Sequence, residues 1–332
     1  MTTAERYFAT VPRVSDPAEA TRVALDVIRW SDEFDLDGIL LYTGAGAVLD
    51  PWVGAAVIAA STRRLTPLVA LNPLYTHPYA AARSLLSVAE VYGRRVDVNL
   101  ITGAALSELS SIGDTLDHRD RYARLREYVE LFMRLLEGRP VTFTGRFYQA
   151  DALQLTPALP PELRPRLYLA GRSADARDTA QALGATLMGM LPEEPERDGG
   201  GIGAAHFGVL ARNTGQEAEE AAARHFPADP VGREVLRMSM ANTDSVWRRA
   251  LAEDSQDLPG SPFRLEPFRT LQADCPYLVG DHDTVVGRIA RTRAAGVHTF
   301  VMDAPTTRED FAHLAKVVQQ LSSSEGEGPV LA

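Results

Sequence analysis

Cationic and hydroxyl side chains gather in the segment DHRDRY, residues 117–122. Apolar residues then recur at three- and four-residue steps as far as Phe132, so a helix is expected to begin here. Asp117 suits the N-cap of that helix, which is the purely structural interpretation. It does not explain His118 and Tyr122. Side chains that donate hydrogen bonds at the positive end of a helix favour an anion such as phosphate.

The segment AGRSADAR, residues 170–177, has a similar character. Gly171 allows close approach of the backbone, Arg172 offers a planar set of donors, and Ser173 can cap a helix or donate to a phosphate. A capped helix without a ligand is the alternative interpretation. Two such helix starts in one chain strengthen the prediction of an anion site.

The histidines and the cysteine form no pattern typical of a metal site or a hydrolase. His-x-His, His-Glu-x-x-His, Cys-x-x-Cys and Gly-x-Ser-x-Gly are all absent, so no metal and no serine nucleophile is predicted. His77, His118 and His206 fall near predicted strand ends or loops, where each could be structural or an acid or base. Cys275, the single cysteine, precedes a proline and is interpreted as structural.

Strands and helices alternate along most of the chain. Apolar runs typical of buried strands occur at 6–10, 37–43, 66–73, 95–102, 166–171, 185–191, 202–213 and 297–303. Helical patterns occur at 16–34, 50–62, 78–92, 118–137, 173–184, from about 215, 281–296 and 307–321. A β-hairpin is predicted at 139–155, a loop at 192–201, and helices with a proline-rich loop at 226–277.

This alternation predicts an α/β fold, and about eight strands at this length favour a closed (β/α)8 TIM barrel. A doubly wound open sheet is the rival, but no Gly-x-Gly-x-x-Gly follows the first strand. We expect one domain over 1–332, with the hairpin inserted after the fourth helix, an insertion that contains a lid at 226–277, and a flexible tail at 322–332. Barrel sites lie at the carboxyl ends of strands. The candidates there are Tyr42, Thr43, Asn72, Asn99, Thr102, Gly171, Arg172, Ser173, Met190, Arg212 and Asp303.

Composition excludes several classes of partner. The net charge of −10 and the lack of a basic stripe argue against nucleic-acid binding. The longest apolar runs, such as 53–60, are too short to span a bilayer, and the first residues contain no signal-peptide core. One cysteine permits no internal disulfide, so a cytoplasmic location is expected.

Five segments occur in the order and spacing seen in the bacterial luciferase-like flavin monooxygenases. They are LVALNPLYTHPYAAARSLLSVAEVYGRRVDVNLITG, GDTLDHRDRYARLREYVELFMRLL, PRLYLAGRSADA, ANTDSVWRR and YLVGDHDTVVGRIARTRAAGVHTFVMD. The chain resembles this family from about residue 36 to 320, and within it the alkanesulfonate monooxygenase branch. The resemblance implies a (β/α)8 barrel that receives reduced FMN from a separate NAD(P)H:flavin reductase. It also implies that O2 forms a C4a-peroxyflavin, which oxygenates the substrate.

The resemblance also implies the positions of the flavin-binding residues. Those facing the phosphate and ribityl chain would be His118, Tyr122, Gly171, Arg172 and Ser173. Asn99 and Thr102 would lie beside the flavin ring or the ribityl chain. Helix starts with added donors suit an FMN phosphate, so the physical argument agrees with the family pattern.

Several residues of the sulfonate-cleaving members are replaced. Ala47 or Val48 stands at their cysteine, and Ala304 or Pro305 at their final tyrosine. Leu271 stands at their mobile arginine, with Arg269 two residues away, and their Arg-x-His becomes His206-Phe207-Gly208. A buried sulfonate needs fixed cations, so we expect instead a neutral or extended organic substrate, oxidised by hydroxylation or Baeyer–Villiger-type insertion.

His206 is the predicted catalytic residue, which would hydrogen-bond the peroxyflavin or act as acid or base. The residues predicted to line the substrate pocket are Tyr42, Ala47, Val48, Trp52, Phe207, Arg269 and Leu271. A biosynthetic enzyme that forms a homodimer or homotetramer is expected. The alternatives are an F420-dependent oxidoreductase of the same fold, a non-catalytic flavin-binding accessory protein, and a barrel hydrolase without flavin.

Overall fold

The computed structural model describes residues 5–11, 17–44, 47, 49–194, 201–253, 260–303 and 307–323. The predicted tail lies outside the described residues from 324 onward, and so does most of the predicted loop at 192–201. Val48, Ala304 and Pro305 also lie outside them.

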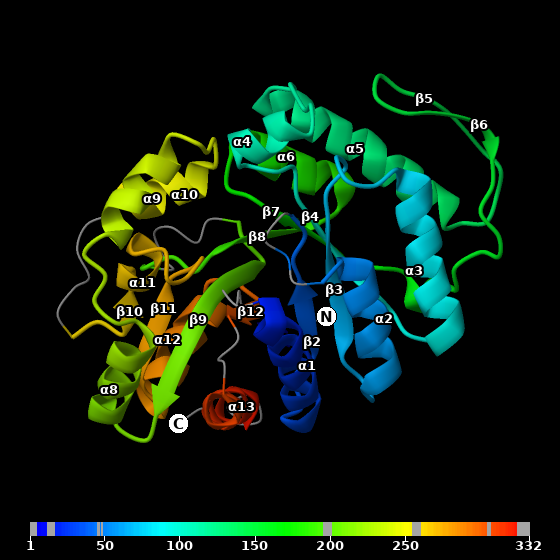
Figure 1. The fold of residues 1–332 in the computed structure, drawn as a ribbon. Helices are drawn as coiled ribbons and strands as arrows, with labels where there is room; N and C mark the ends of the chain where they lie inside the picture. The colour runs from blue at the N-terminus through cyan, green and yellow to red at the C-terminus, as the bar shows by residue number, and fades with distance from the viewer. Residues whose placement is uncertain are drawn as a thin grey trace, which may run out of the picture.

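Eight parallel strands of the described chain close into a barrel, so the predicted (β/α)8 fold is confirmed (Figure 1). In order around the barrel they are β1 (Arg6–Thr10), β2 (Gly38–Leu41), β3 (Thr66–Leu71), β4 (Asp97–Leu100), β7 (Leu167–Ala170), β8 (Thr186–Met190), β9 (Ala204–Arg212) and β12 (Thr299–Asp303). The ring closes because β9 pairs with β8 as well as with β12, whereas an open sheet would end in two unpaired edges.

Helices surround this barrel, and their caps agree with the sequence. They are α1 (Pro17–Glu33), α2 (Pro51–Ser61), α3 (Pro78–Tyr92), α5 (His118–Leu135), α6 (Ala174–Leu183), α8 (Gly215–His225), α12 (His282–Ala294) and α13 (Arg308–Ser323). Asp50 caps α2 and Asp281 caps α12, each through a side chain that accepts a backbone N–H of the first turn. None of the described helices is both long and apolar enough to cross a membrane.

Side chains along each strand alternate between the inside of the barrel and the helical layer. The inner cluster consists of Phe8, Leu40, Leu68, Tyr168, Met188, Ala204 and Val301. On β9, His206 shares a face with Ala204, whereas Phe207 belongs to the outer cluster and packs edge-on against Phe300. Phe207 is fully buried there, so the prediction that it lines a substrate pocket is wrong.

The predicted hairpin is present as β5 (Val141–Thr144) and β6 (Gln149–Leu153), at the side of the barrel in Figure 1. Its turn is fixed to α5, because the Glu127 carboxylate accepts the backbone N–H groups of Arg146, Phe147 and Tyr148 at 2.9, 2.8 and 3.3 Å. A 3-10 turn at Pro161–Leu163 follows before β7.

The second insertion contains α9 (Gly232–Met240), α10 (Val246–Glu253), β10 (Phe263–Arg264), α11 (Glu266–Arg269) and β11 (Tyr277–Asp281). The sequence analysis missed β11, which pairs with the second half of β9, and the short α4 (Leu106–Ser111). Tyr277 lies opposite Gly208 on β9. A Cβ at Gly208 would be 2.2 Å from the Tyr277 ring, so this crossing requires a glycine.

Candidate functional site

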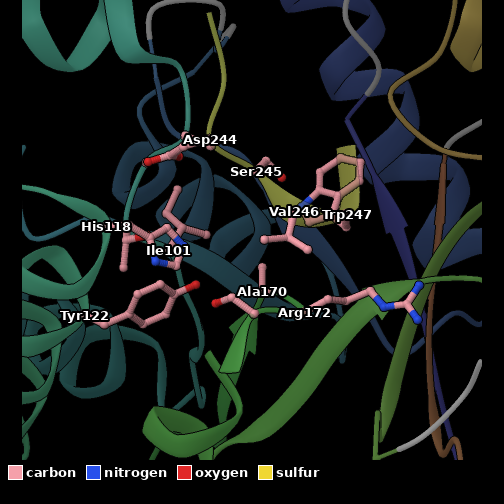
Figure 2. Close-up of a pocket in the computed structure, with 14 residues that line it drawn as sticks. Ile101, His118, Tyr122, Ala170, Arg172, Asp244, Ser245, Val246 and Trp247 are labelled. Carbon is pink, nitrogen blue, oxygen red and sulfur yellow. The ribbon is translucent and has the colours of Figure 1, made fainter. Parts of the chain in front are cut away.

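Two adjoining cavities lie at the carboxyl ends of the barrel strands. The first, which we call the rim cavity, has a volume of about 290 Å³ and the second, the central cavity, about 200 Å³. Ile101, Ala170, Gly171 and Trp247 line both, so the two cavities adjoin along these residues. Figure 2 shows the rim cavity, with Asp244 to Trp247 on one side and Tyr122 and Ala170 on the other.

The start of α6 forms one wall of the rim cavity. Ser173 is the N-cap, and its Oγ accepts the Ala176 N–H at 3.1 Å. A Cβ at Gly171 would lie 2.8 Å from the Ala176 Cβ and 2.9 Å from the Tyr122 hydroxyl oxygen. A glycine is therefore needed to bring the β7–α6 turn against α5, as the sequence suggested.

The start of α5 forms the facing wall. Asp117 caps the helix by accepting the Asp120 N–H at 2.8 Å, which confirms its structural role. Tyr122 is only 5% exposed, and its hydroxyl hydrogen-bonds Ser173 and Thr102. Burial raises the pKa of Tyr122, so the phenol stays protonated and can donate.

His118 joins the two helix starts. Its Nδ1 lies 3.1 Å from the Asp175 carboxylate in the first turn of α6, and its ring centroid lies 5.0 Å from that of Tyr122. Figure 2 shows the Arg172 side chain extending away from His118 and Tyr122. The donors that converge on the rim cavity are therefore hydroxyl groups and helix N–H groups more than the Arg172 guanidinium.

The segment between α9 and α10 closes the site on the opposite side. Asp244, Ser245, Val246 and Trp247 line the rim cavity, and Trp247 also reaches the central one. Arg121 of α5, which is 2% exposed, pairs with Asp244 and holds this segment against the helix. The sequence analysis did not identify this contact, which joins residues 123 positions apart.

The central cavity is mixed in character. Apolar Leu40, Met188 and Met190 line it together with Tyr42, Thr43, Asn99, His206, Arg248 and Asp274. The Asn99 Oδ1 atom is buried and has no hydrogen-bond partner among the described residues. A buried carbonyl oxygen without a donor is a place for a ligand N–H, because an unsatisfied acceptor is costly.

His206 lies at the inner end of this cavity and is 6% exposed. Its Nε2 is 3.2 Å from the Tyr42 hydroxyl oxygen and 4.0 Å from Asp303 Oδ1. Burial lowers the pKa of His206, and the nearby carboxylates of Asp303 and Asp274 oppose that effect. The ring is therefore neutral near pH 7 and able to accept a proton.

Asp303 is the centre of a buried polar cluster. Its Oδ2 accepts the Tyr277 hydroxyl at 2.9 Å, and its Oδ1 accepts the Thr10 hydroxyl at 2.8 Å. Cys275 also hydrogen-bonds Asp303, and burial raises the pKa of its thiol. The sequence did not indicate that Cys275 lies beside other polar groups, yet its Sγ lies within 4.8 Å of ligand atoms on His206 and Asp303.

The remaining predicted pocket residues lie elsewhere. Trp52, Ala47, Arg269 and Leu271 line neither of these two cavities. Trp52 packs against the outer cluster from the first turn of α2, and Arg269 is buried in α11. Of the predicted pocket residues that the structure describes, Tyr42 lies on the central cavity.

The residues present fit a flavin mononucleotide. The rim cavity offers two helix starts, hydroxyl side chains that include those of Tyr122 and Ser173, and the space that Gly171 leaves open, which suit a phosphate. The central cavity offers apolar walls and the unpartnered Asn99 oxygen, which suit a planar ring with an N–H donor.

Solved structures with the same fold carry different cofactors. The oxygenating component of 3,6-diketocamphane monooxygenase from Pseudomonas putida, in complex with FMN, has a TM-score of 0.71 and 15% identity, over 97% of this chain and 98% of that one. An F420-dependent secondary alcohol dehydrogenase has a TM-score of 0.66 and 16% identity, over 96% of this chain and 99% of that one. At these identities the likeness concerns the fold alone.

The sequence comparisons are more specific. A family model described as luciferase-like monooxygenase matches residues 7–204. BtrO from Niallia circulans, a 4-(gamma-L-glutamylamino)butanoyl-[BtrI acyl-carrier protein] monooxygenase, is 30% identical over 96% of this chain and 97% of its own length. The chain belongs to the luciferase-like flavin monooxygenase family.

Proposed function

We propose that the protein is the oxygenating component of a two-component system, which receives reduced FMN from a separate flavin reductase and uses O2 to oxygenate an organic substrate. The adjoining rim and central cavities carry this proposal. One has two helix starts and hydroxyl groups that suit a phosphate, and the other presents His206 and Asn99.

Reduced FMN, when bound, would supply the two electrons that activate O2. Side chains of the protein would supply the binding, orientation and proton transfer. Tyr122, Ser173 and the two helix starts hold the phosphate, and Asn99 orients the ring. Trp247 and the segment before it exclude water, and His206 donates or accepts a proton.

A neutral or extended organic molecule fits the central cavity better than a sulfonate. The charged residues that line it are Arg248 and Asp274, so its lining is not the cationic site that a sulfonate needs. BtrO acts, by its name, on an acyl chain attached to a carrier protein. A carrier-bound acyl chain is the extended substrate that this relative supports for the present protein.

Equilibrium binding under anaerobic conditions tests the cofactor. Reduced FMN should bind, and riboflavin, which lacks the phosphate, should bind much more weakly. Admission of O2 with candidate acyl substrates should then give a product that contains one oxygen atom from 18O2. Hydride transfer from reduced F420 without O2 would contradict the proposal, and so would flavin binding that yields no oxygenated product from an acyl-carrier or free-acid panel.

A further inference from the structure

Three side chains of the kinds that bind transition metals converge at the inner end of the central cavity. One ligand atom each from His206, Cys275 and Asp303 lies within 4.8 Å of the other two. The Nε2 atom of His206 is 4.0 Å from Asp303 Oδ1. The three residues come from β9, from the segment before β11 and from the last position of β12. They are far apart in the sequence, so no metal motif could indicate them.

The spacing of the three ligand atoms suits one small cation. Any three atoms within 4.8 Å of one another share a point no more than about 2.8 Å from each, whereas zinc binds sulfur at about 2.3 Å and nitrogen or oxygen at about 2.0–2.2 Å. Each ligand atom would therefore have to approach the ion by less than about 1 Å. The backbone arrangement of the barrel already brings the three side chains close enough to share an ion.

The chemistry of the three groups favours Zn2+ over Mg2+ or Ca2+. Thiolate and imidazole ligands suit zinc, whereas Mg2+ and Ca2+ prefer sites built from oxygen. The ion displaces the thiol proton of Cys275 to solvent when it binds, so the thiolate and the Asp303 carboxylate together balance its two positive charges. Cys275 is fully buried and His206 is 6% exposed, and a complex with no net charge is one that such a place can hold.

Neighbouring hydroxyl groups hold the carboxylate of Asp303 in place. Tyr277 donates to its Oδ2 at 2.9 Å, and Thr10 donates to its Oδ1 at 2.8 Å. An ionised carboxylate has about four lone-pair positions, so these two hydrogen bonds leave it able to bind a metal as well. Carboxylates that bind metals in proteins are typically oriented by hydrogen bonds of this kind.

We propose that His206, Cys275 and Asp303 form a binding site for Zn2+, with a fourth coordination position open toward the central cavity. His206 lines that cavity, so an ion can reach the ring from there. The site stands on the geometry of the three residues. Its consequence rests on the proposed function: bound Zn2+ occupies the imidazole, so His206 can no longer exchange a proton with the reaction, and oxygenation stops.

Cobalt is a direct probe of the site, because Co2+ bound to a thiolate gives a charge-transfer absorption band and Cys275 is the one cysteine of the chain. Flavin-free, full-length protein that has been treated with a chelator should bind one Co2+ per chain and show this band. Zn2+ should then displace Co2+ and remove the band. Wild-type protein that binds no Co2+, or binds it without the band, would overturn the site, and this outcome needs no variant that might fail to fold.

Substitutions should weaken Co2+ binding in a graded way. Cys275→Ser should abolish the charge-transfer band. His206→Gln and Asp303→Asn should each weaken binding by about 100-fold or more, because a ligand is lost. Tyr277→Phe should weaken it by about tenfold, because it acts only through the orientation of Asp303. Undiminished binding in both His206→Gln and Asp303→Asn would contradict the assignment.

His282→Gln is the matched control. His282 Nε2 lies 3.0 Å from His313 Nδ1, so this pair is a competing site for a divalent ion in the described part of the chain. The pair contains no thiol, so His282→Gln should keep both the band and the stoichiometry. Loss of Co2+ binding in His282→Gln, with full binding in Cys275→Ser, would assign the ion to the histidine pair and overturn the proposal.

The effect on turnover is measured in single-turnover reactions with photoreduced FMN, so that no reductase is exposed to the metal. Zn2+ should inhibit oxygenation over the concentrations at which it displaces Co2+, and a chelator should restore the activity. FMN affinity should not change. Zn2+ binding without inhibition would refute the block of His206. Zn2+ binding by a protein that oxygenates no substrate even after chelation would count against the proposed function and leave the metal site standing.

Discussion

The rim cavity and the central cavity are built in different ways. The rim cavity is lined mainly by short runs of consecutive residues, 101–104, 170–173 and 244–247, together with His118 and Tyr122 from the start of α5. The central cavity takes single residues from many strands, and its acid–base cluster joins Thr10 to Asp303 across 293 positions. Local segments can evolve as motifs, whereas the cluster exists only when the whole barrel has closed.

Because the two cavities are built from different residues, a substitution in the central cavity should abolish catalysis without loss of FMN binding. His206→Ala should lower turnover by about 100- to 10,000-fold, because general acid–base catalysis is lost. FMN affinity should stay close to that of the wild type, since the rim cavity is untouched. Steady-state kinetics and flavin titration measure the two effects, and Phe207→Leu, at the outward-facing neighbour, is the control. Unchanged turnover would exclude His206 as the acid or base.

Substitutions in the rim cavity are expected to act on the other property and weaken FMN binding. Ser173→Ala combined with Arg172→Ala should weaken FMN binding by about 2–5 kcal/mol, through lost bonds to the phosphate. Ser173→Ala should account for the larger share, because Arg172 extends away from the other donors in Figure 2. Riboflavin affinity provides the control and should not change. Equal FMN affinities in wild type and double variant would place the phosphate elsewhere.

Gly171 tests the junction between the two cavities. Gly171→Ala should cost about 1–3 kcal/mol of unfolding free energy and weaken FMN binding, because the new Cβ would overlap Ala176 and Tyr122. Chemical denaturation measures the first effect and flavin titration the second. Gly215→Ala in α8 is the matched control, since a Cβ there meets no atom within 4 Å. A fully stable Gly171→Ala protein would refute the close packing.

The smallest effect concerns pH. Burial lowers the pKa of His206 below its usual 6.5, so the unfolded chain binds a proton first as the pH falls. The resulting stability is complete above about pH 6.5 and is lost as the pH falls toward the lowered pKa, by at most about 1.4 kcal/mol per pH unit. Denaturation at several pH values should show a shallower dependence in His206→Gln. An identical slope would contradict burial of a neutral ring.

The same contrast explains what the sequence could predict. The barrel followed from alternating strands and helices, and the rim residues from their spacing at helix starts. Phe207 was wrongly predicted to line the pocket beside His206. Adjacent residues on a strand point to opposite faces, and Phe207 belongs to the outer cluster. The contact of Cys275 with His206 and Asp303 could not be predicted, because the pairing of β11 with β9 brings the thiol there from a distant part of the sequence.

The ion pair between Arg121 and Asp244 has a kinetic consequence. Arg121 lies in the first turn of α5, and Asp244 begins the segment that lines both cavities. Under the proposed function, flavin and substrate would both lie against this segment, which the ion pair ties to α5. We expect the two ligands to enter in sequence, with the flavin first, because a seated substrate would block its route to the inner end.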